Sequence, residues 1–181
     1  MRTFVAIELP EEIREVLAAE QARFKGAAAD AGWTRPEGIH LTLKFLGEIS
    51  DHQVAGVKRA LREIGRFEPF RVQVKGFGFF PEASRPHVFW AGVDVSPPLA
   101  QLAARVETSL TPLGFVPDKR AFSPHLTLAR FRLSCRQPKL EALLEGHGDA
   151  VLGDLEVSEF FLWESTLTPQ GAQYQKVARF P

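Results

Sequence analysis

The sequence has a single cysteine, no net charge and no long apolar run, and each shortage excludes a class of protein. Cys135 alone cannot form an intramolecular disulfide framework or a multi-cysteine zinc site. The 22 Lys and Arg residues are balanced by 22 Asp and Glu residues, so the chain does not coat nucleic acid through bulk positive charge. No apolar stretch approaches the ~20 residues of a membrane span, and the N-terminus, acidic by Glu8, lacks the pattern of a signal peptide. We therefore expect a cytoplasmic protein in a reducing compartment, without membrane contact.

What the sequence does contain is enough apolar residues for one buried core. Apolar residues make up 45% of the chain, whereas a disordered chain combines low hydrophobicity with high net charge. Segments 26–32 and 168–173 are predicted to be loops, and neither is long enough to separate domains. Residues 1–181 are therefore predicted to form a single domain.

An internal repeat organises this domain. The tetrapeptide His-Leu-Thr-Leu occurs at 40–43 and again at 125–128, an offset of 85 residues. Two copies of this length indicate duplicated lobes, because a stacked solenoid needs more repeats. The same offset aligns Phe4-Val5 with Phe89-Trp90, aligns 70–72 with 155–157, and separates Phe89 from Tyr174.

Each copy is predicted to run strand, helix, strand, helix, strand, from helical spacing or alternation of its apolar residues. Because no steady β-α-β run appears, we predict an α+β fold. It would be bilobal with pseudo-two-fold symmetry, its mostly antiparallel sheets flanked by helices around a central cleft. The segments are 2–9, 11–24, 39–46, 52–65 and 70–80, then 87–95, 97–110, 124–133, 138–145 and 155–164, with a closing strand over 174–180.

Alternation along the two motif strands separates polar from apolar side chains. His40, Thr42 and Lys44 are predicted to share one face, with the leucines on the core side. His125 and Thr127 repeat the arrangement in the second copy. If a pseudo-two-fold axis relates the copies, two imidazoles and two hydroxyls face a common groove.

This set of groups suits phosphodiester chemistry without a metal. A neutral imidazole can take a proton from an attacking oxygen while a protonated one gives a proton to the leaving oxygen, and an ordinary pKa of about 6.5 allows both. Threonine hydroxyls can donate hydrogen bonds to phosphate oxygens. A single His-x-Thr on a strand could equally be solvent-facing. We expect no metal and no other cofactor, since there is no HExxH motif and no acidic residue beside either histidine on its face.

The twin His-x-Thr motifs, the FVAIELP opening and Phe45-Leu46-Gly47-Glu48 resemble the 2H phosphoesterase superfamily. More narrowly, the whole chain is similar to the bacterial and archaeal RNA 2′,3′-cyclic phosphodiesterases, also called 2′-5′ RNA ligases. The resemblance implies one His-x-Thr from each lobe in a central cleft. It also implies hydrolysis of a terminal 2′,3′-cyclic phosphate to a 2′-phosphomonoester, with 2′-5′ ligation by the reverse chemistry.

The resemblance further implies a role for each residue. His40 would be the proton donor to the departing 3′-oxygen, and His125 the proton acceptor that activates water. Thr42 and Thr127 would hold the phosphate. Simple alternation places the residues five after each histidine on the opposite face, but twist or a bulge could return them to the cleft. There Phe45 would stack on a base and Arg130 would contact phosphate; the alternatives are a core Phe45 and a solvated Arg130.

Local charge differs from the neutral total. Residues 117–139 include six cations and one acid, Asp118. This local excess of positive charge predicts contact with RNA phosphates. The expected partner is an RNA end or oligoribonucleotide with a 2′,3′-cyclic phosphate, bound by a monomer. Two alternatives stay open: another nucleotide cyclic phosphate or 2′-5′ oligonucleotide as substrate, and a non-catalytic RNA-end-binding module. The cations are Lys119, Arg120, Arg130, Arg132, Arg136 and Lys139.

Overall fold

A computed structural model describes all 181 residues. The strands are β1 (Arg2–Glu8), β2 (Ala31–Trp33), β3 (His40–Glu48), β4 (Phe70–Phe80), β5 (Val88–Val93), β6 (His125–Phe131), β7 (Val151–Val157), β8 (Phe160–Thr168) and β9 (Gly171–Phe180). The α-helices are α1 (Glu11–Phe24), α2 (Asp51–Arg62), α3 (Pro97–Leu110) and α4 (Pro138–Leu144). Three short 3-10 turns are η1 (Lys25–Ala27), η2 (Pro36–Gly38) and η3 (Thr111–Leu113).

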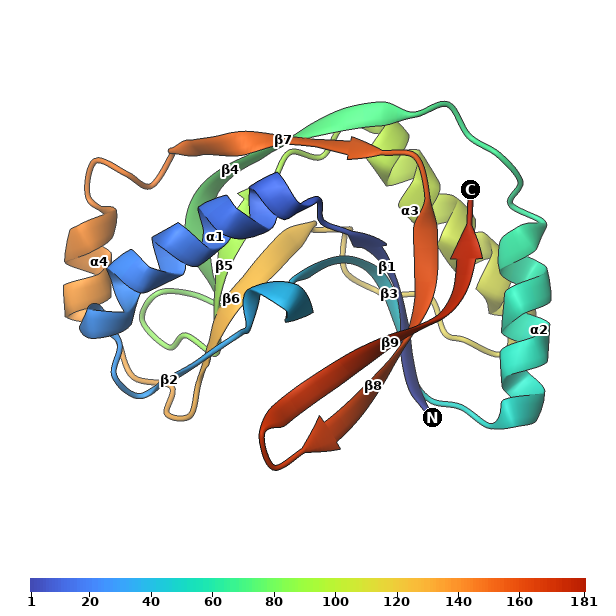
Figure 1. Cartoon of the computed structure of the whole chain (residues 1–181), viewed down its shortest axis with the longest axis horizontal. Helices are drawn as coiled ribbons and strands as arrows, with labels where there is room; N and C mark the ends of the chain where they lie inside the picture. Colours follow the sequence, from blue (N-terminus) through green and yellow to red (C-terminus); the bar gives the residue numbers. More distant parts are fainter.

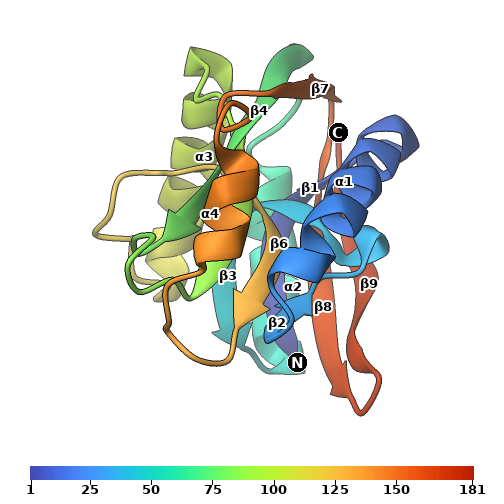
Figure 2. The same cartoon turned by 90° about the vertical axis from the view of Figure 1, so that its left-hand side faces the viewer.

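These strands form two antiparallel sheets, with orders β3-β1-β8-β9 and β2-β6-β5-β4-β7 (Figure 1). The predicted α+β class with antiparallel sheets and flanking helices is therefore confirmed. In Figure 2, α4 lies toward the viewer, and β3 of the first sheet and β6 of the second run near the middle of the molecule.

Local sequence explains where the helices begin. The Ser50 side chain accepts a hydrogen bond from the backbone of Gln53, whose side chain reciprocates, so α2 starts with a capping box. The Ser96 hydroxyl accepts from the backbone of Leu99, and Pro97 occupies the first turn of α3, where its missing N–H costs nothing. Predicted and observed starts of these helices agree within a residue.

The helices cross between the sheets. Helix α1 follows β1 of the first sheet but packs against β7 of the second, whereas α3 follows β5 of the second sheet and packs against β3 of the first. Most buried apolar side chains of both sheets belong to one cluster, which includes Val5, Leu41, Phe89 and Leu126. The two halves share this main core, while Phe4, Ala6, Phe161 and Trp163 form a small separate cluster.

Two predicted boundaries near the C-terminus are wrong. The strand predicted over 155–164 is two strands, since β7 ends at Val157 and β8 begins at Phe160 in the other sheet. The loop predicted over 168–173 is mostly strand, because Thr168 pairs with Gly171 across a two-residue turn. The Ser158-Glu159 break contains neither Gly nor Pro, so the sequence has no signal for it.

The strand pairing also corrects the repeat. Val5 lies opposite Lys44, and Phe89 lies opposite Ala129, so Phe89 corresponds to Val5 at an offset of 84 residues, one less than predicted. The slip matters because one residue reverses the face of a strand, and both Val5 and Phe89 point into the core.

Of the remaining predicted alignments, one agrees with the pairing and one does not. Arg71 pairs with Glu156, 85 positions later, and the antiparallel register is symmetric about this pair, as expected for counterparts across a pseudo-two-fold axis. Tyr174 stands on β9, an edge strand, whereas Phe89 stands on the inner strand β5.

Candidate active site

The two strands that carry the His-x-Thr motifs lie next to each other. Strand β3 is the edge of its sheet and contacts β6 of the other sheet, at the centre of the molecule in both views (Figures 1 and 2). The chain itself links them, because β2 pairs with β6 and then continues through η2 into β3. One motif from each half is thereby brought to the same region.

Both motif strands contain a β-bulge at the same place. The pairing of β1 with β3 shifts between Val5 and Ala6, which leaves Leu43 as an extra residue. The pairing of β5 with β6 shifts between Phe89 and Trp90, which leaves Leu128 as an extra residue, 85 positions later. A bulge interrupts alternation, so the residues beyond it reverse their faces.

The first bulge makes the prediction for Lys44 wrong. Its side chain does not share the face of His40 but is buried against α3, where Nζ lies 2.8 Å from an Oε atom of Glu107. The same Nζ donates to the Val116 carbonyl at 3.1 Å. Lys44 therefore ties β3 to its helix and takes no part in the polar face.

The bulges return Phe45 and Arg130 to the side of the histidines. Phe45 is 67% exposed, so it is not a core residue. Its ring centroid lies 6.0 Å from that of Phe4, which in turn meets His40 edge-on at 5.5 Å. Arg130 is exposed and its charge acts on His125.

His40 lies in an aromatic enclosure. Its ring centroid is 4.4 Å from that of Trp163 and 5.0 Å from that of Tyr174, and the residue is 9% exposed. Burial lowers the pKa of His40 from 6.5 to about 4, because a charged imidazole loses its hydration there. A hydrogen bond with the Gly38 backbone and the charge of Glu8 raise the pKa in opposition. A Cβ at Gly38 would lie 2.8 Å from the Tyr174 ring, so this glycine admits the ring beside His40.

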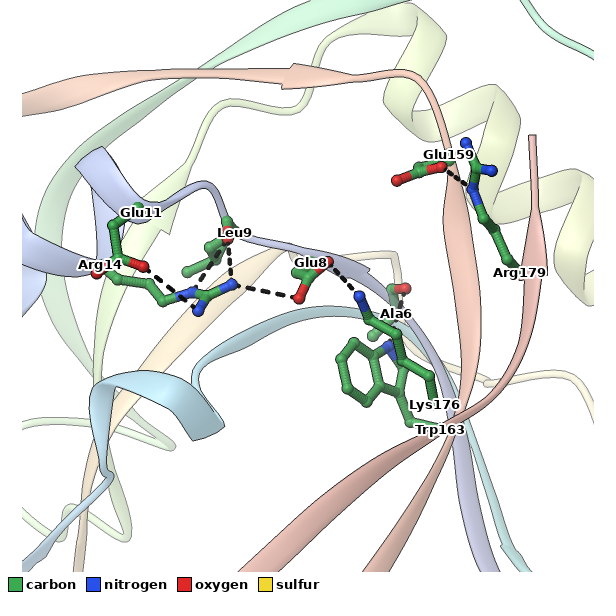
Figure 3. Close-up of polar contacts among 9 residues, drawn as sticks. All are labelled: Ala6, Glu8, Leu9, Glu11, Arg14, Glu159, Trp163, Lys176 and Arg179. Atoms are coloured by element: carbon green, nitrogen blue, oxygen red, sulfur yellow. Dashed lines mark hydrogen bonds and ion pairs between the residues drawn. The ribbon is translucent and has the colours of Figure 1, made fainter.

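A chain of charges links Arg14, Glu8 and Lys176 (Figure 3). Glu8, which pairs with His40 across the β1–β3 ladder, accepts from Lys176 at 2.7 Å and from Arg14 at 3.3 Å. The Lys176 ammonium also lies 5.6 Å from the Trp163 ring centroid. The two cations lower the pKa of His40 and so offset part of the effect of Glu8.

His125 is held differently. Its Nδ1 lies 2.8 Å from the Ser123 carbonyl oxygen, and Phe80 meets the ring edge-on at 4.8 Å. Because a carbonyl can only accept, the neutral ring carries its proton on Nδ1 and leaves the Nε2 lone pair free. Burial lowers the pKa of His125, the Ser123 hydrogen bond opposes this, and the Arg130 charge lowers the pKa further.

Thr42 and Thr127 precede the bulges, so alternation from each histidine holds for them. Both are half-buried, and each lies between two buried leucines of its strand. No group of three or more His, Cys, Asp or Glu side chains lies close enough together to hold a metal ion. The four motif side chains thus lie on two contacting strands, one from each half, with Phe45 and Arg130 at equivalent positions two residues beyond the bulges.

The predicted basic stretch flanks β6 on both sides. Arg136 pairs with Glu141 at 2.9 Å, which leaves five exposed cations without an ion pair: Lys119, Arg120, Arg130, Arg132 and Lys139. None of the helices combines the length and the apolar character that crossing a membrane requires.

Sequence reasoning missed the residues that surround His40. Trp163, Tyr174 and Lys176 come from β8 and β9, more than 120 positions after it. The tryptophans are interpreted from sequence as packing residues, and no local pattern links them to the first motif. Glu8, at the end of β1, is the one residue that the sequence could have linked to His40. If β1 and β3 pair as antiparallel neighbours, a residue of β1 lies opposite that histidine.

Strand β6, which carries the second motif, pairs with β5, and β5 in turn makes a close contact with β4. Trp90 lies opposite Thr127, and its indole covers Gly78 of β4, where a Cβ would overlap the ring. We expect Gly78→Ala to lower the free energy of unfolding by about 1–3 kcal/mol, as overpacking does. Denaturant titration measures this change. Gly26→Ala is the control, since nothing lies within 4 Å of its added Cβ; equal effects at the two positions would contradict the expectation.

Comparison with known proteins supplies the remaining observations. The sequence profile of the family described as LigT like Phosphoesterase matches residues 7–90 and 93–174. A protein of Aeropyrum pernix named RNA 2′,3′-cyclic phosphodiesterase is 40% identical over 159 residues, which cover 85% of this chain and 90% of the relative.

Solved structures agree with this match. A crystal structure of a Thermus thermophilus protein superposes with a TM-score of 0.84 at 29% identity, covering 99% of this chain and 97% of that one. The crystal structure of Escherichia coli LigT complexed with 3′-AMP superposes with a TM-score of 0.81 at 28% identity, covering 99% and 96%.

Proposed function

Since this chain belongs to the LigT-like phosphoesterase family, we propose that it hydrolyses the 2′,3′-cyclic phosphate at an RNA end to a 2′-phosphomonoester. The chain is an enzyme, since relatives named RNA 2′,3′-cyclic phosphodiesterase match it over most of its length. The observation that carries the specific proposal is the pair of His-x-Thr motifs on adjacent strands from the two halves. The chain would act as one monomeric domain of two duplicated lobes, in the cytoplasm.

We assign the proton transfers from the surroundings of each histidine. His125 would accept a proton from water through its free Nε2, as the water oxygen forms a bond to phosphorus. The bond from phosphorus to the 3′-oxygen breaks, and His40 would give that oxygen a proton. The 2′-oxygen keeps the phosphate. The same sequence, with the 5′-hydroxyl of a second RNA end in the place of water, would form a bond from that oxygen to phosphorus as the bond to the 3′-oxygen breaks, and would leave a 2′-5′ linkage.

The lowered pKa of His40 bears directly on its role as donor. With a pKa of about 4, the imidazole is neutral near pH 7 in the free protein. A phosphate anion entering beside it favours the charged form, and the Glu8 carboxylate acts in the same direction. We therefore propose that His40 takes up its proton as the substrate binds.

Thr42, Thr127 and Arg130 would hold the phosphate, and each offers a donor hydrogen to its oxygens. The exposed ring of Phe45 would stack on the terminal base. The unpaired cations around β6 would contact phosphates further along the RNA. No metal takes part in this proposal.

The deciding experiment identifies the product from an oligoribonucleotide that ends in a 2′,3′-cyclic phosphate. We expect a 2′-phosphate, at a rate that EDTA does not change. A 3′-phosphate would contradict the assigned leaving oxygen, loss of activity in EDTA would favour a metal, and unchanged RNA would leave only a binding role. A nucleoside 2′,3′-cyclic phosphate and a 2′-5′ oligonucleotide, assayed in parallel, test the alternative substrates.

A further inference from the structure

A buried glutamine from α1 contacts β6 where that strand departs from regular alternation. Gln21 is 1% exposed, and its Nε2 donates to the Leu128 carbonyl at 3.0 Å and to the Thr34 carbonyl at 2.7 Å. Both partners can only accept, so the amide nitrogen must face them. The contact joins the first helix of one half to the motif strand of the other.

Leu128 is the extra residue of the bulge. It has no opposite residue in β5. On its other side the Leu128 carbonyl accepts from the Thr34 backbone N–H at 2.9 Å, which continues the pairing of β2 with β6, and from the Gln21 amide. Without the amide, a buried carbonyl loses one of its two donors, and the bulged form loses part of its advantage over a regular strand.

The face of Arg130 depends on this bulge. Two residues beyond Leu128, Arg130 lies on the side of His125 only because the bulge reverses alternation. In a regular strand its guanidinium would turn toward the core, and the buried Ala129 would turn to the cleft.

The other half contains a matching arrangement made from different chemistry. Lys44 follows the extra residue Leu43, and Glu107 of α3 binds it at 2.8 Å. In each case a polar side chain from a helix of one half reaches the bulge of the other half's motif strand. A polar contact from a helix is therefore present at both bulges, at the extra residue Leu128 in one strand and at the residue after the extra Leu43 in the other, which indicates a constraint on the site.

We propose that Gln21 is a positioning residue, which holds the β6 bulge and thereby keeps Arg130 on the catalytic side beside His125. The inference rests on the proposed function for the use of Arg130 at the phosphate. Its main test does not, because the effect of the Arg130 charge on the pKa of His125 can be measured without substrate.

The experiment is an NMR titration of the His125 imidazole in wild type, Gln21→Met, Arg130→Gln and the double variant. The Arg130 charge lowers the pKa of His125, so Arg130→Gln should raise it. We expect Gln21→Met to raise the pKa by a similar amount and the double variant to add little more. Where hydrolysis is observed, kcat/KM of Gln21→Met should fall about tenfold or more, because Arg130 is displaced.

The matched control is Gln137→Met. Gln137 is also a buried glutamine, but its amide donates to the Cys135 carbonyl at 3.1 Å and to the Asp30 carboxylate at 3.4 Å, and not to a β6 carbonyl. A folded Gln21→Met with an unchanged pKa of His125 would overturn the proposal, as would additive shifts in the double variant or an equal shift in the control. If Gln21→Met does not fold, Gln21→Asn, one methylene shorter, replaces it with the same expectation. A wild-type chain that leaves the cyclic phosphate intact would overturn the proposed function and not this inference.

Discussion

Replacing His125 with alanine is expected to slow hydrolysis of an RNA 2′,3′-cyclic phosphate by about 10²–10⁴-fold, the usual contribution of a positioned acid or base. The variant loses the Nε2 lone pair that would accept the proton of the attacking water. His40→Ala should give a loss of similar size, through the departing 3′-oxygen. Single-turnover rates, with the product identified as above, measure both.

The double variant separates cooperation from simple addition. If the two histidines act in one transition state, His40→Ala with His125→Ala should be little slower than either single variant. His147→Ala and His52→Ala are matched controls, because both side chains are exposed and lie outside the motifs. A folded His125→Ala with wild-type turnover would contradict the two-histidine mechanism.

The second large effect concerns stability and pH. His40 has a pKa of about 4 in the folded protein and about 6.5 in the unfolded chain. Between these values the unfolded chain binds more protons, so the free energy of unfolding rises with pH. The contribution of neutral, buried His40 to the free energy of unfolding is therefore complete above about pH 6.5. About 3 kcal/mol of the free energy of unfolding is lost as the pH falls to about 4.

Denaturant titrations of wild type and His40→Gln at several pH values measure this loss. The difference in free energy of unfolding between wild type and His40→Gln should change steeply between pH 6.5 and pH 4. The free energy of unfolding of His52→Gln, changed at an exposed position, should follow that of wild type. Inorganic phosphate should reduce the loss, because an anion bound beside the imidazole stabilises its charged form. Parallel pH profiles for wild type and His40→Gln would show that His40 keeps an ordinary pKa.

Alternation predicted the motif faces only as far as the bulges. His40 and Thr42 follow the simple period, but Leu43 adds a residue and sends Lys44 into the core. Bulges are often marked by glycine, whereas these two are at leucines, so no local residue type announces them. We could therefore name Phe45 and Arg130 as cleft residues only through resemblance and the general chance of a bulge.

The surroundings of His40 were beyond local sequence reasoning for a different reason. Trp163 and Tyr174 come from β8 and β9, which lie on the other side of β1 from β3. This strand order depends on the whole fold, so no local pattern predicts it. The repeat predicted the motif strands and the central pair of β4 and β7 at the correct offset, yet it failed for β1 and β5 by one residue. The second half is therefore not a rigid copy of the first.

The crossing of α1 and α3 between the sheets has a consequence for how substrate enters. Many two-lobed enzymes close by a hinge, which needs an interface that can part without exposing the interior. Here any separation of the halves would pull each helix from the sheet it covers and open the shared core to water. The relative position of the two motif strands is consequently set when the chain folds, so the site is assembled before substrate arrives.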